Sequence, residues 1–232
     1  MQQINQNLRY ERKFILNNNM INNIFDLRSY LSINIENHYD QRRVNSIYYD
    51  TYNFCLSEIA KNGISERKKI RIRYYGELDN LLYPKLEIKY KYGLMGRKKT
   101  YDVPFDFLNE NKFSIVSFNQ INNSHDININ LIKTSEPKLI ISYKRNYFLS
   151  CCKRFRFTLD SEIIFKTFDK DNLKQNFNKN LYYHYNKRIL EIKYAYSHES
   201  DAHKLTQKLP VRITSSSKYL IALSYLGLVP LY

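Results

Sequence analysis

The alternation of basic and apolar residues along single segments is the feature that most limits the fold of this chain. Residues 68–76 read KKIRIRYYG, and Lys69, Arg71 and Arg73 occupy every second position. Because side chains alternate between the two sides of a β-strand, these cations share one face, and isoleucine and tyrosine share the other. The segment therefore predicts a strand whose two faces meet very different surroundings.

Four further segments repeat this arrangement: 8–16, 84–92, 153–160 and 187–195. A solvated sheet face normally mixes lysine with glutamate, because like charges on neighbouring strands repel. Here arginine and lysine dominate, so two interpretations stay open: an exposed polar face, or an inward cationic face whose repulsion a bound polyanion relieves. The second interpretation leaves the apolar faces outside, where helices or partner surfaces must cover them. Glutamates among such cations suit a hard divalent cation that bridges to phosphates.

Residue spacing predicts the other elements. Alternation predicts strands at 8–16, 44–50, 54–60, 67–75, 84–92, 97–103, 138–148, 153–160 and 187–195. Helical spacing predicts helices near 20–31, over 198–208 and after Ser217. The segment 93–96 reads as a hairpin turn, and the asparagine-rich segment 119–130 reads as a loop. Nine strands with few helices indicate a mainly β (α+β) protein built on an antiparallel sheet or barrel.

Composition narrows the class of partner and the setting. The formal charge of +15 favours a polyanion, which could be nucleic acid, anionic lipid or a phosphate compound. The three cysteines have neither zinc-site spacing nor a disulfide framework, which favours a reducing compartment. The first residues lack an apolar signal region, and the apolar run 219–229 is too short to span a bilayer and reads as a buried helix. We therefore expect a cytoplasmic protein with a single domain over 1–232.

The order of short motifs resembles a known family. The motifs are Arg9-Tyr-Glu-Arg-Lys13, Ile47-Tyr-Tyr-Asp-Thr51, Arg71-Ile-Arg73, Leu86-Glu-Ile-Lys89, Tyr143-Lys-Arg145, Arg156 with Asp160, Leu190-Glu-Ile-Lys193 and Ser217-Lys-Tyr219. In this order they resemble the triphosphate tunnel metalloenzymes (CYTH superfamily). They are most similar to the VTC domain, the polyphosphate polymerase branch, from residue 9 to about residue 226.

The resemblance implies a fold, a reaction and a set of functional residues. The implied fold is a closed antiparallel tunnel of eight strands with a basic interior, flanked by a few α-helices. The implied reaction transfers the γ-phosphate of ATP onto a growing polyphosphate chain, with Mn²⁺ or Mg²⁺ as cofactor. The implied catalytic residues are Arg71, Arg73, Lys89, Arg145 and Arg156; the substrate-binding residues are Lys13, Lys98, Tyr143, Lys193 and Lys218; and the metal ligands are Glu191 and Glu11.

This sequence departs from the family pattern at two places. Arg9 stands where an ExExK element has another acid, which predicts a thinner metal shell. Ser215 stands where related chains can carry a second lysine, three residues before Lys218. One cationic contact is therefore missing from the expected set.

Other functions remain open at this stage. A metal-dependent triphosphatase would use the same tunnel, with water as the acceptor. A non-catalytic binder of polyphosphate or nucleic acid is compatible with the charge, but the basic residues alternate on strands instead of forming a basic arm or a stacking platform. We therefore expect ATP, triphosphate or polyphosphate as the ligand and no nucleic acid. The sequence leaves open the oligomeric state and whether a membrane or another protein receives the product.

Overall fold

The computed structural model describes residues 9–21, 24–81, 83–93, 95–103, 133–215 and 217–229. The strands are β1 (Arg9–Asn17), β2 (Ile35–Asp50), β3 (Glu66–Tyr75), β4 (Lys85–Tyr92), β5 (Met95–Asp102), β6 (Glu136–Ser150), β7 (Arg156–Thr167), β8 (Tyr183–Tyr185) and β9 (Lys187–Ala195). The α-helices are α1 (Ile24–Leu31), α2 (Cys55–Lys61), α6 (Glu199–Thr206) and α7 (Lys218–Tyr225). The described residues also form the short 3-10 helices η2 (Leu173–Phe177), η3 (Lys179–Leu181) and η4 (Tyr196–His198). The predicted loop 119–130 lies outside the described residues.

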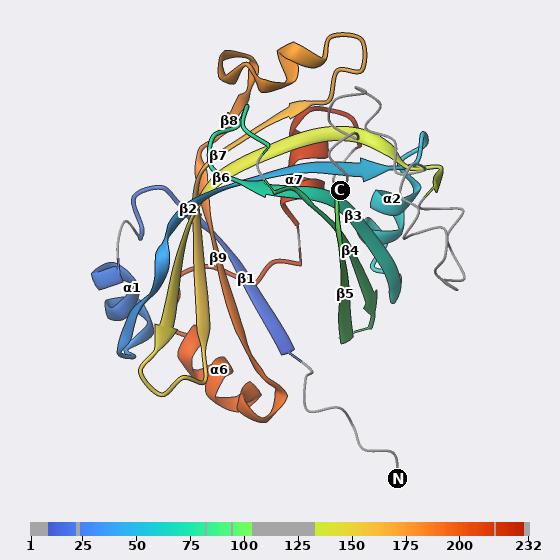
Figure 1. Ribbon diagram of the computed structural model, residues 1–232. Coiled ribbons are helices and arrows are strands. Elements are labelled where there is room, and N and C mark those ends of the chain that lie inside the picture. Colours follow the sequence, from blue (N-terminus) through green and yellow to red (C-terminus); the bar gives the residue numbers. More distant parts are fainter. Residues whose placement is uncertain are drawn as a thin grey trace.

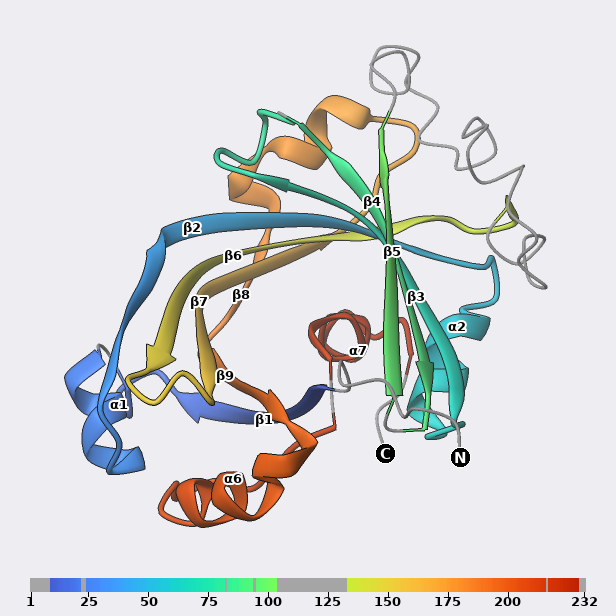
Figure 2. The ribbon, with the colours of Figure 1, turned by 60° about the horizontal axis from the view of Figure 1, so that its bottom comes forward.

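The strands form one antiparallel sheet that curves strongly around helix α7 (Figures 1 and 2). Eight strands follow the path β1-β9-β7-β6-β2-β3-β4-β5, and the short β8 pairs with β7 beside this path. A two-residue hairpin joins β4 to β5, since Tyr92 pairs with Met95 and Gly93 has a φ of 57°. The predicted mainly β, antiparallel architecture is therefore confirmed, and so is the predicted hairpin turn.

The predicted closure of the sheet into a barrel is wrong. The path ends at β1 on one side and at β5 on the other, and these two strands approach each other without pairing. Strand β5 presents Arg97, Lys98 and Lys99 in succession, while β1 carries Glu11, Arg12 and Lys13. Glu11 forms an ion pair across the gap with Lys89 of β4, so side chains and not backbone hydrogen bonds connect the two ends of the sheet. Consecutive charges on an edge strand, as on β5, oppose pairing with another strand.

The predicted strand at 54–60 is also wrong, because this segment forms helix α2. The buried carboxylate of Asp50 accepts hydrogen bonds from the backbone N–H groups of Thr51, Leu56 and Ser57 at 2.8, 2.9 and 3.0 Å. Phe54 adopts a left-handed backbone (φ 58°) that turns the chain into the helix. An acid placed before the segment thus satisfies the free N–H groups of the first helical turn, which outweighs the alternating pattern.

Two apolar cores cover the outer, convex face of the sheet. One lies on β1, β9 and β7, where Phe14, Leu190 and Phe157 pack against α1 and α6. The other lies on β2, β3 and β4, and buried residues of loop 77–81 and of the η2–η3 region close it. The apolar sides of the alternating strands therefore face outward, where helices and loops cover them. The basic sides of the same strands face inward. Within the described ranges, none of the helices is both long and apolar enough to span a membrane.

Helix α7 fills part of the inner, concave face. Its apolar side chains pack with Val44, Ile141 and Ile189 in a third core, inside the curve of the sheet (Figure 2). The hydroxyl of Tyr219 on this helix donates a 2.9 Å hydrogen bond to Asp50, and its ring stacks on Tyr48 at 5.1 Å. The predicted buried helix is confirmed, and its position leaves the remainder of the inner face to charged side chains.

Candidate active site

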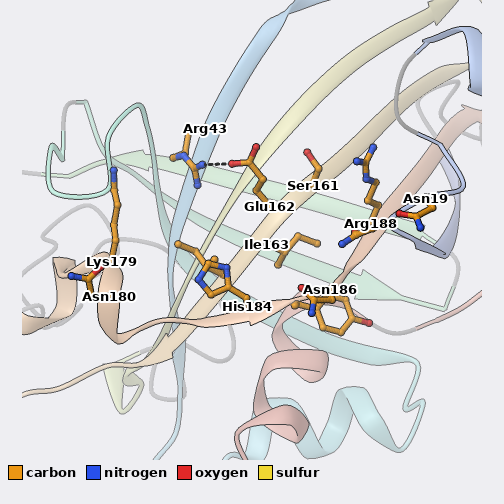
Figure 3. A pocket seen from close by; sticks show the side chains of 13 residues that line it. Asn19, Arg43, Ser161, Glu162, Ile163, Lys179, Asn180, His184, Asn186 and Arg188 are labelled. Atoms are coloured by element: carbon orange, nitrogen blue, oxygen red, sulfur yellow. Dashed lines mark hydrogen bonds and ion pairs between the residues drawn. The ribbon is translucent and has the colours of Figure 1, made fainter.

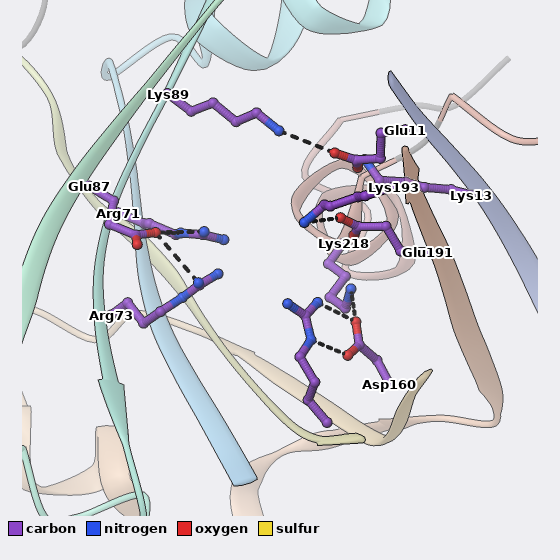
Figure 4. Close-up of polar contacts among 11 residues, drawn as sticks. Glu11, Lys13, Arg71, Arg73, Glu87, Lys89, Asp160, Glu191, Lys193 and Lys218 are labelled. Carbon is purple, nitrogen blue, oxygen red and sulfur yellow. Dashed lines mark hydrogen bonds and ion pairs between the residues drawn. The ribbon is translucent and has the colours of Figure 1, made fainter. Parts of the chain in front are cut away.

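Charged side chains from distant parts of the chain converge on the inner face. In Figure 4 the labelled side chains of β3 and β4 point toward those of β1 and β9, with Lys218 of α7 between them. The charged residues of this group are Glu11, Lys13, Lys69, Arg71, Arg73, Glu87, Lys89, Lys98, Arg145, Asp160, Glu191, Lys193 and Lys218. Cations outnumber carboxylates among them, so this region carries excess positive charge.

Glu87 holds one group of these cations. Its carboxylate accepts hydrogen bonds from Arg71 at 2.6 and 2.8 Å and from Lys98 at 2.8 Å, while Arg73 lies 3.7 Å away. Arg71 also donates to the hydroxyl of Tyr48 at 3.1 Å. Burial alone would raise the pKa of Glu87, but Arg71, Arg73 and Lys98 lower it to about 2. Three predicted ligands thus share a single carboxylate, which fixes their positions before any ligand binds.

The depressed pKa of Glu87 predicts a specific acid response. Because the folded-state pKa is about 2 and the usual value is 4.5, the ion pairs of Glu87 stabilise the fold fully above about pH 4.5. This stabilisation is lost as the pH falls toward 2. An NMR titration of the Glu87 side-chain carboxyl should give a midpoint near 2, and Arg71→Ala should move it upward. A midpoint near 4.5 in the unmodified protein would contradict the ion pairs.

Asp160 holds a second group of cations and is completely buried. Arg145 donates from Nε and Nη2 to its two oxygens at 2.6 and 2.8 Å, and Lys218 also forms an ion pair with it. Burial would raise the pKa of Asp160, yet Arg145 and Lys218 lower it. The ring of Tyr143 lies beneath both cations, at 5.2 Å from the Arg145 guanidinium and 4.8 Å from the Lys218 ammonium. Tyr143 therefore meets these cations through its π face.

Two carboxylates on neighbouring strands form a third group. Glu11 lies 2.5 Å from Lys13 and 3.5 Å from Lys89, and Glu191 lies 2.6 Å from Lys193. Burial and mutual repulsion would raise the pKa of Glu11, but the lysines lower it. Burial would likewise raise the pKa of Glu191, which Lys193 and further cations lower well below its usual value. The side chains of Glu11 and Glu191 are thus both ionised, and the ionised carboxylate is the form that binds a metal.

The donor set around these two carboxylates fits a metal ion that arrives with phosphate. Within the described ranges, no three His, Cys, Asp or Glu side chains lie close enough to hold a metal by themselves. Mg²⁺ typically uses one or two protein carboxylates, with water and substrate phosphates as further ligands. Thr158 lies opposite Glu191 in the register, and its buried hydroxyl has no hydrogen-bond partner among the described residues. Glu11 and Glu191 therefore suit a shared, substrate-completed metal site.

Lys69 and Arg73 show that the internal carboxylates do not fully compensate the cations. Burial, together with the charges of Lys13 and Lys89, lowers the pKa of Lys69 well below its usual value. The Nε–H of Arg73 is buried and has no hydrogen-bond partner in the described part of the chain. A region with unused donors and repelling cations is chemically suited to an anion with several oxygens.

The structure brings most of the predicted residues together, with one exception in position. Lys13, Arg71, Arg73, Lys89, Lys98, Tyr143, Arg145, Lys193, Lys218, Glu11 and Glu191 lie in the three groups above. Arg156 lies on the same face of β7 as Thr158 and Asp160 and opposite Lys193 in the register of β7 and β9, but it is exposed and outside the three groups. Ser215, which stands where related chains can carry a second lysine, is also exposed.

Sequence reasoning missed four members of the site as functional candidates. Glu87 and Lys69 share faces with predicted ligands, so the alternation of their strands could have revealed them. Asp160 was part of a motif, but its pairing with Lys218 joins positions far apart in the chain. Tyr48 was also part of a motif, but the hydrogen bond that Arg71 donates to its hydroxyl joins it to the next strand.

A separate hollow lies where β7 bends, away from the groups above. It has a volume of about 560 Å³ and is lined by residues that include Arg43, Glu162, His184 and Arg188 (Figure 3). Glu162 has a left-handed backbone (φ 48°) and pairs with Arg43 at 3.0 Å. None of the predicted phosphate ligands lines this hollow.

The fold of this chain is similar to that of solved proteins. A Bacillus halodurans protein named as a candidate adenylate cyclase is similar in structure, with a TM-score of 0.55 and 11% identity over 93% of this chain and 96% of its own. A Hippeastrum protein, named as a candidate adenylyl cyclase with a dominant triphosphatase activity, has a TM-score of 0.49 and 14% identity over 95% of this chain and 98% of its own. The fold is that of the CYTH, or triphosphate tunnel, proteins.

The family follows from the sequence itself. The VTC domain pattern matches residues 8–227, and the chain belongs to the VTC domain family. No curated protein matches the sequence significantly. Membership implies an enzyme that handles phosphate or triphosphate compounds.

Proposed function

We propose that this protein is a polyphosphate polymerase that transfers the γ-phosphate of ATP onto a growing polyphosphate chain. The observation that supports it best is the convergence of cations from separate strands onto one concave face, in excess of the carboxylates that hold them. Both substrates of such a reaction are polyanions, and both need the same kind of surface. Arginine suits it because a planar guanidinium can bind two phosphate oxygens at once.

The reacting phosphates would lie among the cations that surround Glu87 and Asp160. Arg71, Arg73, Lys89 and Arg145 would stabilise the charge that develops on the transferred phosphoryl group, and Arg156 would join them from its exposed position opposite Lys193. Lys13, Lys98, Tyr143, Lys193 and Lys218 would bind the nucleotide phosphates and the acceptor chain. Helix α7 covers the apolar part of the inner face. The phosphate chain would therefore bind along the charged part, which α7 leaves open.

The chain needs no nucleophile of its own for this reaction. The terminal phosphate of the acceptor attacks the γ-phosphate in line, and the bond to the β-phosphate oxygen breaks as ADP leaves. Phosphoryl transfer depends on positioning and on charge stabilisation, which fixed cations provide. The ion pairs to Glu87 and Asp160 hold Arg71 and Arg145 in place before the substrate arrives.

Glu11 and Glu191 would hold the divalent cation, Mn²⁺ or Mg²⁺. When bound, this ion would neutralise phosphate charge and help to align the reacting oxygens. The neighbouring residues Lys13 and Lys193 lower the pKa values of Glu11 and Glu191. Both carboxylates therefore stay ionised, ready to bind the cation. Chelation of the metal should therefore abolish turnover.

Incubation of the protein with ATP and Mn²⁺ tests the proposal. Polyphosphate chains that form a ladder on a gel, and that disappear when EDTA is added, are the expected result. Release of free phosphate without chains would favour a triphosphatase of the same fold, in which water is the acceptor. Tight binding of nucleic acid with no turnover of ATP would contradict both enzymes and favour a non-catalytic binding protein.

A further inference from the structure

The inner face continues beyond the cations as a group of aromatic residues. On β3, Tyr75 follows Arg73 by two positions, and on β6, Tyr147 follows Arg145 by two positions. Residues two apart on a strand share a face and are separated by about 7 Å. Each tyrosine is therefore one such step from a cation proposed to bind phosphate.

The two tyrosines belong to one cluster with residues of β2. Tyr39 pairs with Tyr147 across the sheet, and their rings meet edge to face at 5.8 Å and 85°. Arg42, which lies opposite Arg145 in the register, holds its guanidinium 5.8 Å from the Tyr39 ring and 6.0 Å from the Tyr75 ring. We call Tyr39, Arg42, Tyr75 and Tyr147 the tyrosine cluster.

The tyrosine cluster is open to solvent, unlike the aromatic residues that build the cores. Tyr39 is 55% exposed and Tyr75 is 43% exposed, whereas Tyr74 and Tyr143 are almost completely buried. Several aromatic rings gathered on a surface around an arginine offer π faces and a cation to a flat ligand. Nucleobases bind to such surfaces by stacking, and the binding tolerates changes of base because every base has a π face.

We propose that the tyrosine cluster binds the base of a nucleoside triphosphate whose phosphates lie among Arg71, Arg73 and Arg145. The inference rests on the proposed function, because it takes the location of the phosphates from it. The distance of about 7 Å along the strand from Arg73 to Tyr75 matches a ligand in which a ribose separates the phosphates from the base. Inorganic triphosphate has no aromatic ring that could stack on the tyrosine cluster. The donor substrate class is thus nucleoside triphosphates, selected over inorganic triphosphate by stacking.

Calorimetric titration of the full chain with ATP and with inorganic triphosphate, each with Mn²⁺, tests the inference. Stacking contributes about 1–3 kcal/mol per base by alanine substitution, so Tyr75→Ala should weaken ATP binding about tenfold. Inorganic triphosphate should bind Tyr75→Ala as it binds the unmodified chain, within about twofold. Tyr75→Phe keeps the ring and should restore ATP affinity. Tyr39→Ala should weaken ATP in the same selective way.

Tyr83→Ala is the matched control, since Tyr83 is 86% exposed and lies outside the cluster. It should change neither affinity. Equal losses for ATP and inorganic triphosphate in Tyr75→Ala, or no loss for either, would overturn the base site. If inorganic triphosphate binds and Arg71→Ala abolishes its binding, the phosphate site stands even when the base site fails. If the unmodified chain binds neither ligand, the base site and the proposed function fail together.

Discussion

Arg71→Ala should lower the rate of phosphoryl transfer by about 10³-fold or more, with little loss of stability. Arginines that meet transition-state charge contribute 10³- to 10⁵-fold in other phosphoryl-transfer enzymes. Arg71 is held in place by Glu87 and Tyr48, so its guanidinium needs no ordering when substrate binds. Glu87 keeps Lys98 and Arg73 as partners after the substitution, and the fold should therefore survive. Steady-state turnover of ATP with Mn²⁺ measures the loss.

The control for this prediction is Arg154→Ala. Arg154 is about half exposed, and its ion pair with Asp201 spans 3.6 Å on the surface. Removing it should leave turnover within about twofold, because surface pairs contribute little. Comparable rates for Arg71→Ala and Arg154→Ala would mean that Arg71 does not contact the reacting phosphates.

Asp160→Ala should destabilise the protein by about 3–5 kcal/mol. Asp160 is completely buried between Arg145 and Lys218, and its removal leaves two cations without their shared partner. Breaking a buried ion pair by deleting one member typically costs this much. Urea denaturation measures the change. Inorganic triphosphate should recover part of the lost stability, because an anion that binds the native state alone can neutralise the same cations.

Asp102→Ala is the matched control for Asp160→Ala. Asp102 also pairs with a lysine, Lys85, but its side chain is 76% exposed. We expect a change of at most about 1 kcal/mol, since water already screens this pair. A similarly small effect of Asp160→Ala would show that the buried carboxylate is not needed to hold Arg145 and Lys218 together.

The charged face of each strand could be predicted from the sequence because it depends on strand period alone. Once 67–75 and 84–92 are read as strands, Arg71 and Arg73 must share one face of the first strand, and Glu87 and Lys89 must share one face of the second. The register, which pairs Arg71 with Glu87, brings these two faces to the same side of the sheet. The order of short motifs then identified the family. The convergence of these faces follows from the curvature of the sheet, which the alternation cannot specify.

The failures of prediction arose where a residue outside the segment decided its structure. Segment 54–60 alternates like a strand, but the carboxylate of Asp50 caps it as a helix. Closure of the barrel depended on whether the two edge strands, β1 and β5, would pair, which the pattern of a single strand does not specify. The position of α7 inside the curve could not be predicted either, because its contacts, such as the Tyr219–Asp50 hydrogen bond, join residues far apart in the chain.

A crystal structure of the protein soaked with inorganic triphosphate and Mn²⁺ would test the central claim most directly. We predict that the phosphate groups lie on the inner face, in contact with Arg71, Arg73 and Arg145, and that Mn²⁺ lies between them and the carboxylates of Glu11 and Glu191. Triphosphate bound in the hollow beside Arg43 and Arg188, with the inner ion pairs unchanged, would contradict the account.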